Sequence, residues 1–159
     1  MYPLRLTPGP LPRDLEEHLH GLITSEVTPT IPVEAPFDAT TIGHIPEGGQ
    51  SCVDKAFSLA REAQRGWQDT PHATRRSIVR TFHSLVLTHR ELLMDMVQLE
   101  TGKNRAAAFD EVMDVASTAR YYAARAEKLL TPRRRQGTIP ALSSTVEHCY
   151  PLGVVGQIS

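Results

Sequence analysis

The stretch that decides the fold is residues 70–130, TPHATRRSIVRTFHSLVLTHRELLMDMVQLETGKNRAAAFDEVMDVASTARYYAARAEKLL. Thr70 followed by Pro71 is typical of a helix start, because a hydroxyl suits the N-cap and proline suits the first helical position. Apolar side chains then recur at helical spacing and form one apolar face: Ile78, Val79, Phe82, Leu85 and Val86. The pattern predicts an amphipathic helix that ends at the polar pair His89 and Arg90.

Two further helical runs follow in the same stretch. The first carries Leu92, Leu93, Met96, Val97 and Leu99, and it ends at Gly102, a natural C-cap, with Lys103 beside the negative helix end. The second collects eight apolar or small residues on one side: Val112, Val115, Ala116, Ala119, Tyr122, Ala123, Ala126 and Leu130. These helices need another part of the chain to cover their apolar faces.

Another helix is expected just before this stretch. Ser51 with Asp54 three residues later predicts its start, and an apolar stripe follows: Val53, Ala56, Phe57, Ala60, Ala63 and Trp67. We expect Trp67 to be a core anchor rather than a ligand contact. The short connection that follows predicts that this helix runs antiparallel to the next one.

The N-terminal residues are the least regular part. Seven of the 12 prolines lie in the first 36 residues, which argues against a packed element there, although Asp14–Leu22 is expected to form a short helix. His18 and His20 would point to different sides of it, which favours a solvated surface over a metal site. Residues 33–45 read as a small hairpin, in which Pro32 and Pro36 would have to lie on an edge strand.

The last residues change from helical to strand patterns. Arg133–Arg135 lack interleaved aromatics and a second basic patch, so we expect a solvated linker rather than a nucleic-acid site. Ser144–Tyr150 alternates like a strand, and Val154–Ile158 is the short apolar kind of strand that parallel sheets bury. Such a strand needs neighbours and covering helices, so the sequence looks like the first part of an α/β domain, predominantly helical as it stands.

Composition narrows the class of protein. A hydrophobic content of 40% and a charged content of 22% are ordinary for a globular domain, and a net charge of −1 offers no field for nucleic acid or an anionic membrane. No apolar run is long enough for a membrane span, and no secretory signal is visible. Two distant cysteines, Cys52 and Cys149, favour reduced thiols and a cytoplasmic location.

The residues by themselves predict no catalytic or metal site. Cys52 lies in the first turn of a helix but has no activating base beyond Lys55, and Cys149 is expected to pack within a strand. Residues 100–103, ETGK, lack the preceding glycine of a phosphate loop, and a helix C-cap explains them. The seven histidines show no metal-ligand spacing.

Five short motifs, in order, resemble the NAD(P)-dependent aldehyde dehydrogenases over about residues 33–159. They are Gly66-Trp67, Thr70-Pro71 with Arg75-Arg76, LETGK at 99–103, RYYA at 120–123 and PLGVVGQIS at 151–159. Within that family the chain looks most like the succinate-semialdehyde dehydrogenases, chiefly through Leu93-Met94-Asp95 and the last motif.

The resemblance implies an oxidoreductase that oxidises an aldehyde, with succinic semialdehyde as the expected substrate and NAD or NADP as the cofactor. In the family a cysteine thiolate attacks the aldehyde, a glutamate activates water, and an asparagine and a backbone N–H hold the oxyanion. All of these groups belong to later parts of the family pattern, and neither cysteine here occupies the nucleophile's position. Only Ile158 and Ser159 correspond to residues that line the cofactor pocket.

The same resemblance divides the chain into four parts. Residues 1–32 form a proline-rich arm, 33–130 the hairpin and helices of the cofactor-binding domain, 131–151 the start of the oligomerisation strands, and 152–159 the first strand of the dinucleotide-binding sheet. We expect that these residues alone are an inactive N-terminal fragment that does not bind the cofactor and that self-associates, since the family is homo-oligomeric.

Two other interpretations remain open on the sequence. A second chain could supply the rest of the enzyme, or the residues could form a self-contained helical interaction module without enzymatic activity. A cooperative thermal transition would favour the module.

Overall fold

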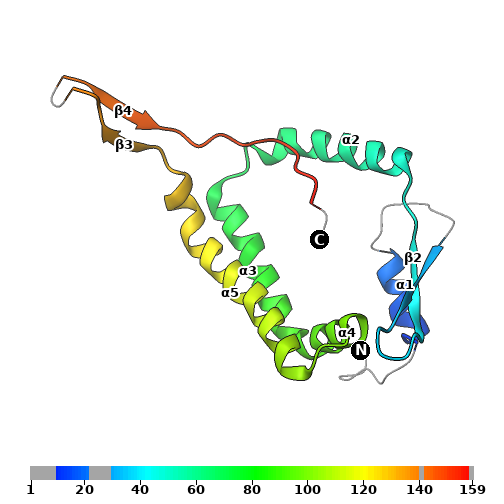
Figure 1. Ribbon diagram of the computed structural model, residues 1–159. Coiled ribbons are helices and arrows are strands. Elements are labelled where there is room, and N and C mark those ends of the chain that lie inside the picture. Colours follow the sequence, from blue (N-terminus) through cyan, green and yellow to red (C-terminus); the bar gives the residue numbers. More distant parts are fainter. Residues whose placement is uncertain (1–9, 22–29, 140–141, 158–159) are drawn as a thin grey trace.

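The chain forms an open frame of helices with a strand hairpin on one side (Figure 1). The computed structural model describes residues 10–21, 30–139 and 142–157. The elements are α1 (Arg13–Gly21), β1 (Thr30–Glu34), β2 (Thr41–Pro46), α2 (Gln50–Trp67), α3 (His72–Thr88), α4 (Arg90–Thr101), α5 (Arg105–Leu130), β3 (Arg133–Gln136) and β4 (Ser144–Glu147). None of the described helices combines the length and apolar character that crossing a membrane requires.

The packed centre of the frame is the pair α3 and α5, which share the most extensive contact between elements. Small side chains on one face of α5 allow the helices to approach closely, and all of them are buried: Ala108, Ala116, Ala119 and Ala123, with Val112. Val86 of α3 and Met94 of α4 complete this core. The three helical runs predicted from periodicity are thereby confirmed, with breaks at His89 and Gly102.

The apolar side predicted for α5 is only partly buried. Val115, Tyr122 and Leu130 stay exposed, because they lie on the flank of the stripe that faces α3. The predicted face was therefore too wide, and a second surface of α5 is left uncovered.

Polar contacts fix how α4 joins α5. Gly102 adopts the left-handed C-cap conformation with φ 70°, as predicted, and its N–H donates to the Gln98 carbonyl at 2.9 Å. Asn104 is the N-cap of α5, and its side chain accepts from the Ala107 N–H at 2.9 Å. This N-cap was not predicted from the sequence.

Arg105 at the start of α5 binds three side chains of α4. Its guanidinium donates to Asp95, Glu91 and Gln98, and the Asp95 side chain is almost fully buried. Desolvation opposes the charged guanidinium, but its hydrogen bonds to Asp95 and Glu91 raise the pKa of Arg105 above its ordinary value. The arginine thus stays charged and ties the two helices together.

The expected hairpin is present as the antiparallel pair β1 and β2. Its register pairs Ile31 with Ile45 and Val33 with Gly43, and it shifts between Val33 and Glu34. Pro32 lies in β1, which is tolerated because each strand of a two-stranded sheet is an edge. Ala35 and Ile42 pack on Leu99, which docks the hairpin on the end of α4.

Residues 10–21, the described part of the proline-rich arm before β1, are packed, contrary to the expectation. Leu15 of α1 is only 2% exposed, and the Leu11 N–H donates to the Ile42 carbonyl at 2.7 Å. The His44 N–H donates to the Glu16 carboxylate at 3.0 Å, and His20 makes a 2.6 Å hydrogen bond with the His44 carbonyl. The unpaired backbone groups of β2 supply partners that the composition of the arm does not reveal.

Two helix starts differ from the prediction. The N-cap of α2 is Gly49 rather than Ser51, because the helix already includes Gln50, whose side chain donates to Asp54 at 2.9 Å. The N-cap of α3 is Pro71 rather than Thr70, whose hydroxyl instead donates back to the Gly66 carbonyl at 3.3 Å. Neither Gly49 nor Pro71 provides a side-chain cap.

Helix α2 does not pack against α3 as an antiparallel neighbour. It diverges from α3 beyond their connection (Figure 1), and none of its residues is buried. Trp67 is 47% exposed, so the expectation of a core anchor is wrong in this structure. The stripe of α2 lacks a surface to cover it among the described residues.

Residues 133–136 form a strand rather than a linker. β3 pairs antiparallel with β4, with Arg133 opposite Glu147 and Gln136 opposite Ser144, and this hairpin projects from the frame (Figure 1). Arg135 donates to Glu147 across the pair at 2.6 Å. The predicted strand over 144–150 is thus confirmed only for Ser144–Glu147.

The described part of the last predicted strand, residues 154–157, has no regular secondary structure. A strand requires hydrogen bonds to a neighbour, and no described strand lies beside these residues. The apolar pattern of the sequence identifies the segment, but it does not supply the neighbouring strand that the segment would pair with.

Candidate functional site

The two residues predicted to line a cofactor pocket, Ile158 and Ser159, lie outside the described residues. The segment that leads to them passes beside α2 toward the inside of the frame (Figure 1). Gly153 has φ 97°, a conformation that favours glycine, and a Cβ added there would lie 3.5 Å from Nε2 of Gln64 on α2. Gly153 therefore turns this segment against α2.

A single arginine holds the corner between α2 and α3. Arg75 donates to the carbonyls of Trp67 at 2.8 Å and of Gln68 at 2.9 Å, which are end groups of α2. Its guanidinium also lies 5.3 Å from the centre of the Trp67 ring, within range of a cation–π contact. The Gly66-Trp67 and Thr70-Pro71-Arg75 motifs thus meet in one structural unit, which sets the direction of α2.

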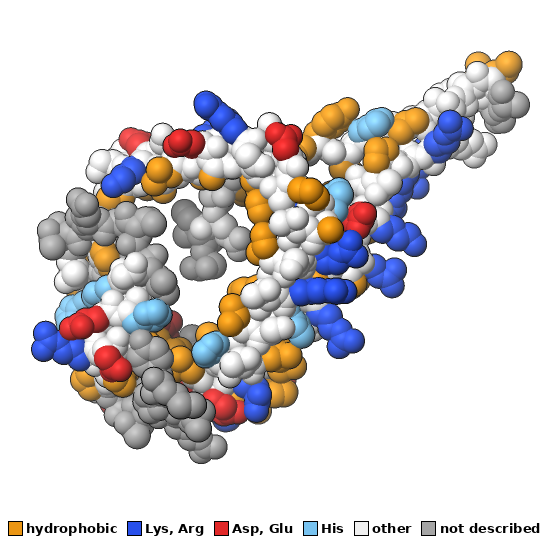
Figure 2. Space-filling view, turned by 180° about the vertical axis from the view of Figure 1, so that it is seen from behind, with side chains coloured by type: hydrophobic (Ala, Val, Ile, Leu, Met, Phe, Trp, Pro, Cys, Tyr) orange, Lys and Arg blue, Asp and Glu red, His pale blue; other side chains and the backbone are white. Residues whose placement is uncertain are grey.

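The frame leaves apolar surface uncovered around its open centre. Figure 2 shows hydrophobic side chains along the helices that border this opening. On α3 the exposed residues Ile78, Phe82 and Leu85 share one helical face, and on α2 Phe57 is 41% exposed. Leu152 in the final segment is 94% exposed. Such contiguous apolar faces are typical of surfaces that another part of a protein covers.

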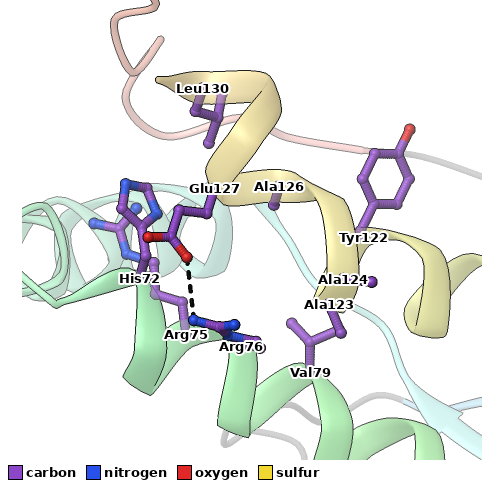
Figure 3. A pocket seen from close by; sticks show the side chains of 10 residues that line it. All are labelled: His72, Arg75, Arg76, Val79, Tyr122, Ala123, Ala124, Ala126, Glu127 and Leu130. Carbon is purple, nitrogen blue, oxygen red and sulfur yellow. Dashed lines mark hydrogen bonds and ion pairs between the residues drawn. The ribbon is translucent and has the colours of Figure 1, made fainter. Parts of the chain in front are cut away.

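A small pocket lies between the beginning of α3 and the end of α5 (Figure 3). It has a volume of about 100 Å³, and His72, Val79, Tyr122 and Leu130 are among the residues that line it. Arg76 from α3 donates to Glu127 from α5 at 3.1 Å across it. This ion pair neutralises the charge of Arg76, and the remaining lining is mostly apolar.

A second, more open pocket of about 380 Å³ continues along the same seam. It is lined by Arg80, His83, Ser84, Arg120, Ala123 and Ala124, and the two alanines also line the first pocket. Its lining contains no carboxylate. This cluster was not predicted from the sequence, although the four-residue spacing from Arg76 to Arg80 on one helix was a usable signal.

Neither cysteine lines one of the two pockets. Cys52 is half-buried on α2, and Cys149 is exposed after β4. Within the described ranges, no group of three or more His, Cys, Asp or Glu side chains lies in an arrangement that could hold a metal ion. Lys103 of the ETGK motif pairs with Glu111, a contact between the α4 end and α5.

Comparison with known sequences identifies the family. The sequence model of the aldehyde dehydrogenase family matches residues 23–159. The chain is 47% identical over 128 residues to "Putative succinate-semialdehyde dehydrogenase (NADP+)" of Mycolicibacterium smegmatis, covering 80% of this chain and 25% of that protein. It is 40% identical over 134 residues to a similarly named protein of Mycobacterium ulcerans, covering 84% of this chain and 26% of that protein. The chain therefore spans about a quarter of the length of these relatives.

Solved structures agree with this assignment at the level of the fold. Betaine aldehyde dehydrogenase from Staphylococcus aureus superposes with a TM-score of 0.69 at 24% identity, covering 80% of this chain and 27% of that one. NADP-dependent glyceraldehyde-3-phosphate dehydrogenase from Bacillus halodurans superposes with a TM-score of 0.65 at 25% identity, covering 70% of this chain and 23% of that one. The helical frame is thus a part of the fold of these enzymes, and the chain belongs to the aldehyde dehydrogenase family.

Proposed function

We propose that the chain is the N-terminal part of an NAD(P)-dependent dehydrogenase that oxidises succinic semialdehyde to succinate. The observation that carries this proposal is the 47% identity to the Mycolicibacterium smegmatis protein over 80% of the chain. The identity to the solved aldehyde dehydrogenases of other substrate classes is lower, at 24% and 25%.

In this proposal residues 33–130 are a scaffold for the cofactor-binding domain. The uncovered stripe of α3 (Ile78, Phe82, Leu85) supports it, because a scaffold packs against the sheet that it carries. Residues 152–159 are the entry to that sheet, with Ile158 and Ser159 lining the cofactor pocket. Residues 131–151 begin the oligomerisation strands, which fits the projecting hairpin of β3 and β4.

The 159 residues by themselves are then inactive and do not hold the cofactor. Cys52 is half-buried on α2 and Cys149 is exposed after β4, and within the described residues neither sulfur is hydrogen-bonded to a histidine or lysine. The nucleophile, the glutamate and the oxyanion asparagine that the family uses belong to the part of the relatives that this chain does not span.

A chimera tests the proposal directly. These residues replace the aligned quarter of the Mycolicibacterium smegmatis relative, and formation of NADPH or NADH is followed at 340 nm with succinic semialdehyde. We expect turnover by the chimera, a preference for this substrate over acetaldehyde and betaine aldehyde, and none by the 159 residues alone. A folded chimera that prefers another aldehyde would contradict the substrate assignment.

The self-contained module is the second candidate. Its specific support is the well-packed core of α3, α4 and α5. It requires the 159 residues to unfold cooperatively as a monomer, which calorimetry with size-exclusion chromatography measures.

A further inference from the structure

We propose that the seam between α3 and α5 binds a small dianion, a phosphate group or a dicarboxylate, between Arg80 and Arg120. This site lies in the 380 Å³ pocket lined by Arg80, His83, Ser84, Arg120, Ala123 and Ala124. The pocket does not include the expected cofactor residues, and anion binding there is a property additional to the proposed oxidation of an aldehyde.

The charge of the seam is concentrated and incompletely neutralised. Helix α3, HATRRSIVRTFHSLVLT, contains no Asp or Glu, and His72, Arg76, Arg80 and His83 follow one another on one side of it at helical spacing. Arg76 pairs with Glu127, but among the described residues neither Arg80 nor Arg120 has a carboxylate within ion-pair distance. Two cations that line one pocket without a counter-ion repel each other, and a bound dianion removes that repulsion.

The shape of the seam leaves room for such a ligand. Ala123 is 8% exposed and packs toward α3, and Ala124 beside it is small, so no side chain fills the space between the two arginines. A guanidinium presents parallel N–H donors that match the paired oxygens of a carboxylate or phosphate. The hydroxyl of Ser84 already donates to the Arg80 carbonyl at 3.1 Å, which leaves the arginines and His83 as the donors.

The site stays open when the apolar face of α3 is covered. At 3.6 residues per turn, Arg76, Arg80 and His83 lie on the side of α3 opposite to Ile78, Phe82 and Leu85. Figure 2 shows the same separation, with Lys and Arg side chains along the edge of the long helices away from the central opening. Whatever packs on the apolar stripe therefore leaves the anion site accessible.

The test is titration calorimetry of the 159-residue chain with sodium phosphate and with sodium succinate, each at an ionic strength matched with sodium chloride. We expect saturable binding of at least one dianion, which also identifies the ligand class. R80Q and R120Q should each weaken it about fivefold, as loss of one exposed charge contact allows, and the double variant should abolish it. R125Q, on the exposed side of α5 and outside both pockets, is the matched control and should bind like the original chain.

Two results would overturn the proposal: no saturable heat with either dianion, or equal affinity in the double variant. Because Arg80 and Arg120 are exposed, far-ultraviolet circular dichroism should show an unchanged fold in all variants. The readout is equilibrium binding, so an inactive chimera would contradict the proposed function and leave this result unaffected.

Discussion

At the scale of single residues, Arg75 is the side chain on which the direction of α2 depends. It combines two hydrogen bonds to the carbonyls at the end of α2 with a ring contact to Trp67. Arg75 is itself part of α3, so these contacts join the two helices directly. This geometry explains why Trp67, Pro71 and Arg75 occur together in the sequence, since all three shape the connection between α2 and α3.

Replacing Arg75 with alanine should therefore loosen the corner and destabilise the chain by about 2 kcal/mol, because charge-assisted hydrogen bonds and an exposed cation–π contact are lost. Trp67 is the sole tryptophan of the chain, so its fluorescence reports on this corner without labelling. We expect a changed emission intensity in R75A and partial recovery in R75K, which keeps the charge. An unchanged spectrum in R75A would contradict the role assigned to this arginine.

A second residue-scale prediction concerns two glycines with opposite surroundings. Gly102 has φ 70°, and a Cβ there would lie 3.2 Å from Cγ of Pro36, whereas Gly66 lies in the helix α2 with nothing within 4 Å. G102A should destabilise the chain by about 1 kcal/mol or more, and G66A should stabilise it by up to about 1 kcal/mol. Urea unfolding followed by circular dichroism measures both, and shifts of the same sign would contradict the assignment.

At the scale of elements, the α4–α5 junction depends on Arg105. The side chain bonds Asp95, Glu91 and Gln98, and Asp95 is buried. R105M should destabilise the chain by about 3 kcal/mol, because it leaves a buried carboxylate without its charged donor. R90M is the matched control, since Arg90 makes only exposed contacts, an ion pair with Glu91 at 3.6 Å and a hydrogen bond to the Leu87 carbonyl at 3.2 Å. It should change the free energy of unfolding by less than about 1 kcal/mol. Equal effects of the two variants would rule out this account.

The elements also show what periodicity can and cannot predict. Helices α3, α4 and α5 follow from the spacing of apolar residues, and Gly102 follows from the chemistry of the left-handed C-cap. Ser51 and Thr70 were wrongly predicted as N-caps. Helix α2 already includes Gln50, so Ser51 lies inside the helix, and the Thr70 hydroxyl donates to the Gly66 carbonyl. Strand β3 was missed because it forms by pairing with β4, and Arg133–Arg135 carry no strand pattern of their own.

The candidate site was less predictable than the helices, because it depends on contacts between residues that are distant in the sequence. The Arg80–Arg120 pocket joins residues 40 positions apart, and only the packing of α3 on α5 brings them together. Ile158 and Ser159 came from the resemblance to the family, and they stay a prediction because they lie outside the described residues. The family itself was predictable because its motifs occur in order along the chain.

At the scale of the whole molecule, the two sides of α3 divide the chain into a surface for packing and a surface for solvent. Ile78, Phe82 and Leu85 face one way, and the basic residues face the other. If the apolar side is a contact surface for the rest of an aldehyde dehydrogenase, a charge there should have opposite consequences in the two settings. In the 159 residues alone, a charged side chain on this stripe reduces the exposed apolar area. In a complete enzyme, the same side chain would be buried in a core.

F82E tests this argument, because Phe82 is 49% exposed in the present chain. We expect F82E to shift the 159 residues toward monomer in size-exclusion chromatography, and to remove most activity of the chimera by preventing its assembly. R125E, which changes a charge at an exposed position of α5 outside the apolar stripe of α3, should leave both properties as they are. If F82E left the chimera fully active, the apolar stripe of α3 would not be the packing surface, and the proposed scaffold role of residues 33–130 would fail with it.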